Sequence, residues 1–177
     1  MSKIYITGVS GTGKSTLAAE LINRGVAAFD MDAVDDLCDW RHKKTREPGT
    51  YEYGIGAEWL DEHEYVCDQK KLEQLINAPK GNVAVLGVVS NQDELLPLFD
   101  KVFLLCCKEE TFLHRLDTRD GDNQFAKDKS EQEHILSWYK GFEKKMLEQG
   151  AIPISTEDPI DKVADKIMAE TDPVKTF

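Results

Sequence analysis

The chain has 177 residues, of which 41% are hydrophobic and 31% are charged, and its formal net charge is −11. This length suits one α/β domain and is too short for two ordinary ones. No apolar run approaches the length of a membrane span, and the first apolar run comes too early to leave room for a signal peptide, so we expect a cytoplasmic protein without a membrane partner. The negative charge argues against a nucleic-acid partner, because it would repel a phosphate backbone.

A glycine-rich loop near the start of the chain is the most specific motif. It occupies residues 8–16, between an apolar run at 4–6 and a segment from Leu17 whose apolar spacing is helical. Strand, loop and helix therefore follow in the order of a phosphate-binding P-loop, the Walker A motif. Glycines let the backbone approach a polyphosphate, and the loop N–H groups form a nest that the helix N-terminus reinforces. Lys14 offers a charge for the β- and γ-phosphates, and Ser15 a hydroxyl for Mg²⁺. The predicted nucleotide-binding residues are Gly8, Gly11, Thr12, Gly13, Lys14, Ser15 and Thr16.

The next part of the chain alternates strand and helix signals. A strand at 26–29 is followed by helical spacing at 33–40 and by a polar segment at 41–56, expected to be irregular with a turn at 48–49. The apolar spacing then predicts one long amphipathic helix at 57–78 and a strand at 83–89. The strand is continuously apolar, which indicates burial on both faces, as in a parallel sheet covered by helices.

The remaining elements repeat this alternation. We expect a strand at 102–107, a helix at 108–119 and then a polar loop. A helix follows, which opens with a capping box at 130–133 and ends at 149. The last elements are a strand at 151–154 and a helix starting at 160, and the tail after Thr171 is expected to be loose. Five strands separated by helices predict an α/β fold with a doubly wound parallel sheet, because each parallel crossover needs a helix.

Two carboxylates stand at the carboxyl end of the second predicted strand. Asp30 and Asp32 are two residues apart, so their side chains leave the same face, on the side where the P-loop opens. One could hold Mg²⁺ through water while the other orients or deprotonates an acceptor hydroxyl. One could instead merely cap the following helix. Which of the two would act as the base is left open.

A pair of arginines precedes the polar loop. Arg115 and Arg119 lie one helical turn apart and face the same way, so both could stabilise charge on a transferred phosphoryl group. The loop after them is polar and contains glycine, as a closing lid would be, and we place this lid at about 115–129. Pairing with surface carboxylates is the alternative role for these arginines.

Two further polar segments leave their roles open. The basic residues of segment 41–46 could hold an anionic group of the acceptor or could form a solvated loop. Residues 90–92 could contact the acceptor at the end of the third strand or cap a helix. The sequence carries no signal for the oligomeric state.

Taken together, the P-loop within the first residues, the Asp-x-Asp at 30–32 and the Arg-x-x-x-Arg at 115–119 resemble the small P-loop kinases related to adenylate, shikimate and gluconate kinases. The chain is also similar to bacterial stand-alone P-loop or AAA-family ATPases. The resemblance implies a P-loop NTPase three-layer sandwich with strand order 2-3-1-4-5, flanking helices, a lid after the fourth strand, and ATP with Mg²⁺ as donor. It implies one kinase-like domain over 1–177, with a helical insertion at about 33–78 that binds the acceptor.

Site roles follow from the same resemblance. Asp30 corresponds to the Mg²⁺-associated acid, together with Ser15, and Asp32 to the acceptor-binding acid; no strand here ends in the usual Walker B acid, so Asp30 takes that role. Arg115 and Arg119 correspond to lid arginines near the phosphates, and the turn at 155–159 to a loop that borders adenine. The catalytic set is therefore Lys14, Asp32, Arg115 and Arg119. The function so implied is a kinase that moves the γ-phosphoryl group of Mg-ATP to a small-molecule acceptor, such as a nucleoside, a nucleotide or a hydroxy acid; a regulatory P-loop protein that binds or hydrolyses ATP without such an acceptor is the alternative.

Overall fold

A parallel sheet forms the centre of the molecule. The computed structural model describes residues 1–120 and 123–171. Its main sheet consists of β1 (Lys3–Thr7), β2 (Ala27–Asp30), β6 (Val83–Leu86), β7 (Lys101–Cys106) and β8 (Ile152–Ser155). Neighbouring strands are parallel and follow the order β2-β6-β1-β7-β8. The numbers β3 to β5 belong to a second sheet, so the order counted within the main sheet alone is 2-3-1-4-5.

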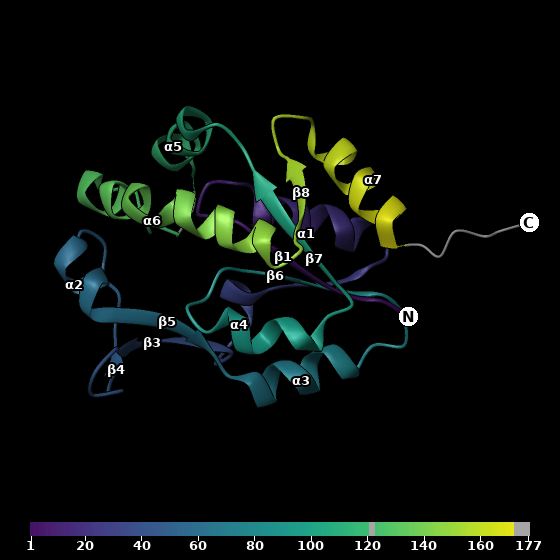
Figure 1. Cartoon of the computed structure of the whole chain (residues 1–177), viewed down its shortest axis with the longest axis horizontal. Coiled ribbons are helices and arrows are strands. Elements are labelled where there is room, and N and C mark those ends of the chain that lie inside the picture. The colour runs from purple at the N-terminus through teal and green to yellow at the C-terminus, as the bar shows by residue number, and fades with distance from the viewer. Residues whose placement is uncertain (121–122, 172–177) are drawn as a thin grey trace, which may run out of the picture.

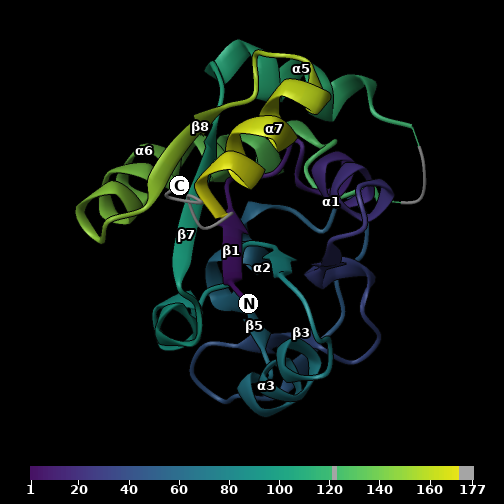
Figure 2. The same cartoon turned by 90° about the vertical axis from the view of Figure 1, so that its right-hand side faces the viewer.

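Helices cover both faces of this sheet and complete a three-layer sandwich. Helices α1 (Lys14–Asn23) and α7 (Ile160–Thr171) lie on one face, and α3 (Gln69–Asn77) and α4 (Gln92–Leu95) lie on the other (Figures 1 and 2). Ile4 and Ile6 pack with α1 and α7, whereas Tyr5 between them packs with α3 and α4. This alternation explains the continuously apolar strands, because both faces of each strand are buried.

The segment between β2 and α3 forms a second sheet. Strands β3 (Cys38–His42), β4 (Pro48–Gly49) and β5 (His63–Cys67) are antiparallel in the order β4-β3-β5, and the short helix α2 (Ala57–Glu62) precedes β5. Strands β3 and β5 pair along their whole length, from Cys38 opposite Cys67 to His42 opposite His63. Figure 1 shows this sheet below α6, to the left of α3 and α4.

Three predictions for this segment were wrong. The helix expected at 33–40 is a 3₁₀ turn, Met31–Ala33, followed by β3, and the single helix expected at 57–78 is α2, β5 and α3. The expected turn at 48–49 is strand β4. Apolar spacing in 57–78 fits a helix, but the extended backbone at His63, with φ −115° and ψ 158°, ends α2 there. Pairing with β3 satisfies the hydrogen-bonding groups of the β5 backbone. This long-range pairing therefore outweighs the helical apolar spacing of the segment. The insertion therefore combines a three-stranded antiparallel sheet with helices α2 and α3 and is not helical throughout.

Two helices between β7 and β8 pack against each other. Helix α5 (Glu109–Thr118) and helix α6 (Lys129–Glu148) share a buried cluster that contains Phe112 and Tyr139. The N-cap of α6 is Asp128, which accepts from the Ser130 N–H at 2.9 Å, so the expected capping box at 130–133 is not the cap. Part of the predicted lid, 121–122, and the tail from 172 lie outside the described residues. Within the described part of the chain, no helix has both the length and the apolar character needed to cross a bilayer.

Candidate active site

The P-loop backbone is held open by glycine and by internal hydrogen bonds. Gly11 has φ 85°, and a Cβ there would lie 2.6 Å from the Phe112 carbonyl oxygen, so only glycine fits at this bend. The buried Thr12 hydroxyl donates to the Val9 carbonyl at 2.7 Å, which turns this side chain into the loop rather than toward a ligand. Helix α1 follows directly, and its N-cap, Gly13, makes no side-chain cap hydrogen bond. The first N–H groups of α1 are therefore available to an anion.

Lys14 is folded back onto this loop. Its Nζ donates to the carbonyl oxygens of Gly8 at 2.6 Å and Val9 at 3.1 Å, and the residue is 9% exposed. Burial lowers the pKa of Lys14 to about 8, while the nearby carboxylates of Asp32 and Asp30 oppose this shift. An ammonium group in such surroundings interacts strongly with a phosphate, because little water competes for it.

A cavity of about 460 Å³ opens above the loop. We call it the P-loop cavity; its walls include residues 10–16, Asp32, Arg115, Arg119, Thr156 and Asp158. Thus the loop, both predicted arginines and the turn expected to border adenine come together. The predicted Gly8 is not among the lining residues and instead contributes its carbonyl to Lys14.

The two arginines of this cavity have different surroundings. Arg115 donates to the Thr156 carbonyl at 2.7 Å and hydroxyl at 3.2 Å, which ties α5 to the turn after β8. Arg119 donates to the Phe125 carbonyl and, at 3.2 Å, to Asn123, yet its Nε is buried without a partner among residues 1–120 and 123–171. Burial lowers the pKa of Arg119, and Asp32 opposes this effect. Arg115 is therefore braced by the fold, whereas Arg119 retains an unused donor near the predicted base.

Asp30 and Asp32 separate into two roles. The Asp30 carboxylate accepts from the Asp32 N–H at 3.2 Å and so caps the 3₁₀ turn, which the sequence left open as one possibility. Met31 between them is buried against Gly87, where a Cβ would lie 2.4 Å from the Met31 sulfur. This close approach fixes the turn against the end of β6. Asp32 is turned toward the P-loop, accessible to solvent and close to Lys14.

The environment of Asp32 favours a proton-accepting role. Exclusion of water by the surrounding protein raises the pKa of the Asp32 carboxyl. The charge of Lys14 lowers this pKa, the Asp30 carboxylate raises it, and a hydrogen bond with the Tyr65 hydroxyl lowers it. Burial and Asp32 in turn raise the pKa of Tyr65, so its hydroxyl keeps its proton. A carboxylate whose pKa is raised is a stronger base than one with the ordinary pKa.

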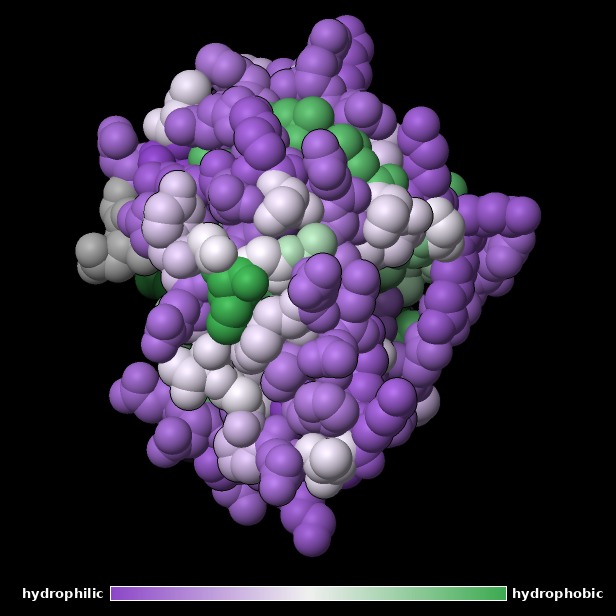
Figure 3. Space-filling view, turned by 90° about the vertical axis from the view of Figure 1, so that its left-hand side faces the viewer, coloured by the Kyte–Doolittle hydropathy of each residue, from purple (hydrophilic) through white to green (hydrophobic). Residues whose placement is uncertain are grey.

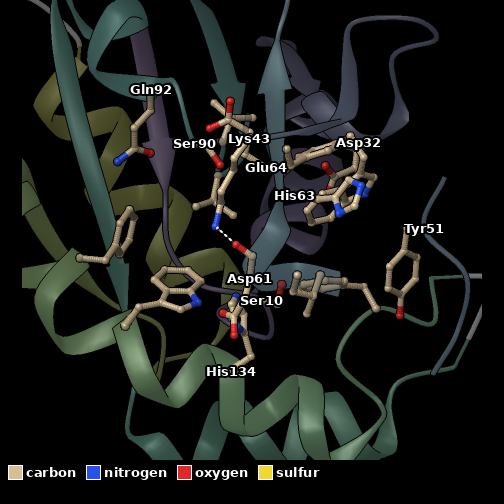
Figure 4. Close-up of a pocket in the computed structure, with 18 of the residues that line it drawn as sticks. Ser10, Asp32, Lys43, Tyr51, Asp61, His63, Glu64, Ser90, Gln92 and His134 are labelled. Carbon is tan, nitrogen blue, oxygen red and sulfur yellow. Dashed lines mark hydrogen bonds and ion pairs between the residues drawn. The ribbon is translucent and has the colours of Figure 1, made fainter. Parts of the chain in front are cut away.

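A second, larger cavity of about 850 Å³ lies between the antiparallel sheet and α6. We call it the aromatic cavity, because its lining includes Trp40, Tyr51, Tyr65, Phe125, Trp138 and Phe142. Figure 4 shows Asp32, His63 and Glu64 on one side, His134 below them and Tyr51 further along. The outer surface at this end is mostly hydrophilic (Figure 3).

The loop after β6 holds the second sheet in place. The Ser90 N–H donates to the Tyr65 carbonyl at 2.7 Å, and the Asn91 side chain exchanges two hydrogen bonds of 3.0 Å with the Cys67 backbone. Ser90 and Gln92 line the aromatic cavity, whereas Asn91 makes no side-chain cap hydrogen bond to α4. Of the two roles left open for residues 90–92, these positions fit cavity lining and support of β5.

The two cavities meet at three residues. Ser10, Asp32 and Asn123 line both of them, and they come from the P-loop, the turn after β2 and the described part of the predicted lid. A molecule in the aromatic cavity and a phosphate chain in the P-loop cavity would therefore share the surroundings of Asp32. This arrangement suits transfer of a group from one cavity to the other.

A buried carboxylate links the second sheet to the loop before α6. Glu131 is fully buried and accepts from the Tyr51 hydroxyl at 2.9 Å and from the Ala126 N–H at 2.8 Å. Its neighbour Gln132 donates to the Ala126 carbonyl at 3.1 Å. The position of Phe125 in the aromatic cavity is thus coupled to that of Tyr51.

The aromatic lining was missed by sequence reasoning. Five aromatic residues fall within 40–65, which is a high density for a segment expected to be polar and helical. They are Trp40, Tyr51, Tyr53, Trp59 and Tyr65. That density was an available signal, but it does not reveal that Phe125 and Trp138 join them, since those lie far away in the chain.

The residues suit Mg²⁺ that is delivered with a nucleotide. Among residues 1–120 and 123–171, no three His, Cys, Asp or Glu side chains gather as an all-protein metal site would require. Mg²⁺ usually keeps several waters and binds through few protein oxygens plus substrate phosphates. Ser15 lines the P-loop cavity, whereas Asp30 is not among the lining residues but lies close enough to raise the pKa of Lys14. An oxygen-only donor set of this kind fits Mg²⁺.

A family model described as an AAA domain matches residues 4–136. This range contains the P-loop, both aspartates and both arginines, as well as the antiparallel sheet. No curated protein matches the chain significantly.

Solved structures share the fold at low sequence identity. Shikimate kinase from Acinetobacter baumannii in complex with shikimate is 19% identical with TM-score 0.60, covering 96% of this chain and 92% of that one. Deoxyadenosine kinase from M.mycoides with bound dATP is 17% identical with TM-score 0.56, covering 95% and 98%. A gluconokinase from Sinorhizobium meliloti 1021 is 17% identical with TM-score 0.55, covering 95% and 90%. The chain therefore has the fold of small P-loop kinases.

Proposed function

The chain belongs to the AAA-domain family, and on this premise we propose that it is a kinase that moves the γ-phosphoryl group of Mg-ATP to a hydroxyl of a small-molecule acceptor. The single observation that carries the proposal is that two cavities, one formed by a P-loop and one lined by aromatic rings, meet at Asp32. A protein that only bound ATP would need the first cavity alone. We propose that residues 1–177 act as one domain, with 33–78 for the acceptor and 115–129 as lid.

The P-loop side would hold the donor. Backbone N–H groups of residues 11–16 and the N-terminus of α1 receive the phosphates, and Lys14 exchanges its carbonyl partners for phosphate oxygens. Arg119 brings its unpaired Nε toward the transferred group, and Arg115 fixes the turn at Thr156 against the nucleotide. Mg²⁺ enters with ATP as part of the substrate and neutralises phosphate charge; Ser15 and Asp30 are its proposed contacts.

The acceptor side would supply the nucleophile. Asp32 accepts the proton of the acceptor hydroxyl as the oxygen forms its bond to the γ-phosphorus, and the bond from that phosphorus to the β,γ-bridging oxygen breaks to leave ADP. The raised pKa of Asp32 favours proton acceptance, and the charge of Lys14 stabilises the negative charge of the transferred phosphoryl group. Most of the rate enhancement comes from holding the two substrates in line.

The test uses the purified chain, ATP, Mg²⁺ and a panel of hydroxylated metabolites, with ADP release and the mass of the acceptor as readouts. We expect one class of acceptor to raise ADP release strongly and to gain one phosphoryl group. Asp32→Asn should then lower kcat by about 10²–10⁴-fold while ATP still binds. Asp61→Asn is the matched control, because Asp61 also lines the aromatic cavity but its side chain is 71% exposed.

The same assay decides against the regulatory alternative. Slow ATP hydrolysis that no acceptor stimulates, with Asp32→Asn unchanged, would contradict a kinase. Absence of Mg²⁺-dependent ATP binding would contradict the role of the P-loop itself.

A further inference from the structure

The walls of the aromatic cavity are flat rings from distant parts of the chain. The Trp40 ring lies 5.1 Å from that of Tyr65, 6.1 Å from that of Phe125 and 6.3 Å from that of Tyr51, measured between centroids. All four line the cavity, and on its α6 side Trp138 and Phe142 pack edge to face at 5.6 Å. Rings arranged around an open volume bind other flat rings well, because stacking adds to the burial of apolar surface.

Most positively charged groups near this cavity already have a polar partner. The basic segment 41–46 could have held an anion, but Arg41 makes two hydrogen bonds to Asp39, of 3.0 and 2.7 Å, and Arg46 pairs with Glu64. Among the described lining residues, the two lysines have partners too: Lys43 donates to the Asp61 carbonyl at 2.7 Å (Figure 4), and Lys145 pairs with Asp93.

The negative charges of the lining outnumber the lysines. Asp32, Asp61 and Glu64 line the cavity, and no arginine does so within the described residues. His134 lies 3.1 Å from Asp61, and burial lowers its pKa, so it adds no positive charge at neutral pH. A phosphate or carboxylate placed here would face carboxylates without a guanidinium to receive it, which is unfavourable in a partly desolvated site.

We propose that the acceptor is a ring-bearing alcohol without a phosphate or carboxylate group. This rests on the proposed function and narrows it, since the sequence left an anionic acceptor open. The flat ring packs against the cavity wall that Trp40, Tyr65 and Phe125 form, and the hydroxyl points to Asp32. The arginines that receive anions, Arg115 and Arg119, line only the P-loop cavity and so serve the donor.

Binding can be measured without any transfer, because the three tryptophans of the chain all lie at this cavity. Trp40 and Trp138 line it, and Trp59 packs 5.2 Å from Trp40. Intrinsic fluorescence therefore reports occupancy. Two matched pairs test the charge rule: 3-phenylpropane-1,2-diol against 3-phenyllactate, and thymidine against thymidine 5′-monophosphate. Shikimate and gluconate serve as anions without an aromatic ring, and a non-hydrolysable ATP analogue with Mg²⁺ occupies the P-loop cavity throughout.

We expect the uncharged member of each pair to change the fluorescence at an at least tenfold lower concentration than its anionic partner. Trp40→Leu should weaken ring binding by about tenfold, while leaving affinity for the ATP analogue unchanged. Asp61→Arg, at an exposed position, should reduce the preference for the uncharged member by about fivefold.

Each result has one meaning. Equal or tighter binding of the anionic members, or no binding by any ring compound, would overturn the inference. Selective binding of uncharged rings that are never phosphorylated in the presence of ATP would support the ligand class and refute the kinase assignment, so the two proposals fail separately.

Discussion

The two cavities on either side of Asp32 recognise their ligands by different means. The P-loop cavity, of about 460 Å³, presents backbone N–H groups, a lysine and two arginines, whereas the aromatic cavity, of about 850 Å³, presents rings and carboxylates. In the first, one wall comes from a continuous stretch, residues 10–16, to which α5 and the turn after β8 add side chains. The second is formed by the antiparallel sheet, the loop after β6 and α6. The comparison teaches that nine consecutive residues can supply a phosphate-binding loop, whereas a site for an aromatic ring needs several segments that are distant in the chain.

The largest expected effect comes from removing the ammonium group of the P-loop cavity, which tests whether this cavity binds the phosphates. Lys14→Met should lower kcat/KM for ATP by about 10³-fold, because a buried charge aimed at the phosphates is lost. Steady-state kinetics measure the loss, and thermal unfolding checks that the fold remains. Lys43→Met is the matched control: Lys43 faces the aromatic cavity, so KM for ATP should not change. A loss in Lys14→Met of less than tenfold would contradict its assignment.

The second prediction separates the two arginines. Arg119→Lys should lower kcat by about 10–100-fold, since Arg119 lines the P-loop cavity and lysine cannot reproduce its planar donor set. Arg115→Lys should mainly raise KM for ATP, because Arg115 holds the turn at Thr156. If the two variants change kcat and KM in the same proportions, the arginines do not divide these roles.

The third prediction concerns pH. The pKa of Lys14 is lowered to about 8 in the free protein, and bound phosphates raise it again, so binding above pH 8 takes up a proton. Affinity for ATP should therefore fall as pH rises above 8, by up to about tenfold per pH unit. Calorimetry in two buffers with different ionisation enthalpies measures the proton uptake directly. Lys14→Met should show neither the uptake nor the slope, and a slope retained in that variant would assign the effect to another group.

The smallest expected effect tests the link between the antiparallel sheet and the loop before α6. Tyr51→Phe removes the hydroxyl that donates to the buried Glu131 and should destabilise the fold by about 1 kcal/mol. It should also raise KM for the acceptor about threefold, because Phe125 is positioned through the same carboxylate. Tyr53→Phe, at a residue 62% exposed, is the control for both unfolding and kinetics. Identical behaviour of the two variants would show that the Tyr51–Glu131 contact positions nothing.

The predicted core was right because its signals are local. The strands of the main sheet were found within a few residues of their observed ends, except that β6 ends at Leu86 rather than at 89. Apolar runs of strand length, helical spacing between them and a glycine loop all act within short windows of sequence. The same reasoning gave an Asp pair and an Arg pair, and the structure brings Asp32, Arg115 and Arg119 to one cavity. Their chemical roles remain proposals.

The sequence by itself determined the P-loop and the sheet that presents it, because a bend of glycines, a lysine and the start of a helix need no distant partner. Only the tertiary structure decided the aromatic cavity. Trp40 meets Tyr65 because β3 pairs with β5, and Phe125 joins them because Glu131 holds the preceding loop. The helical apolar spacing at 57–78 did not indicate this pairing. Strand β5 makes its hydrogen bonds with residues far away in the chain, and such bonds produce no periodic pattern in the sequence of the segment itself.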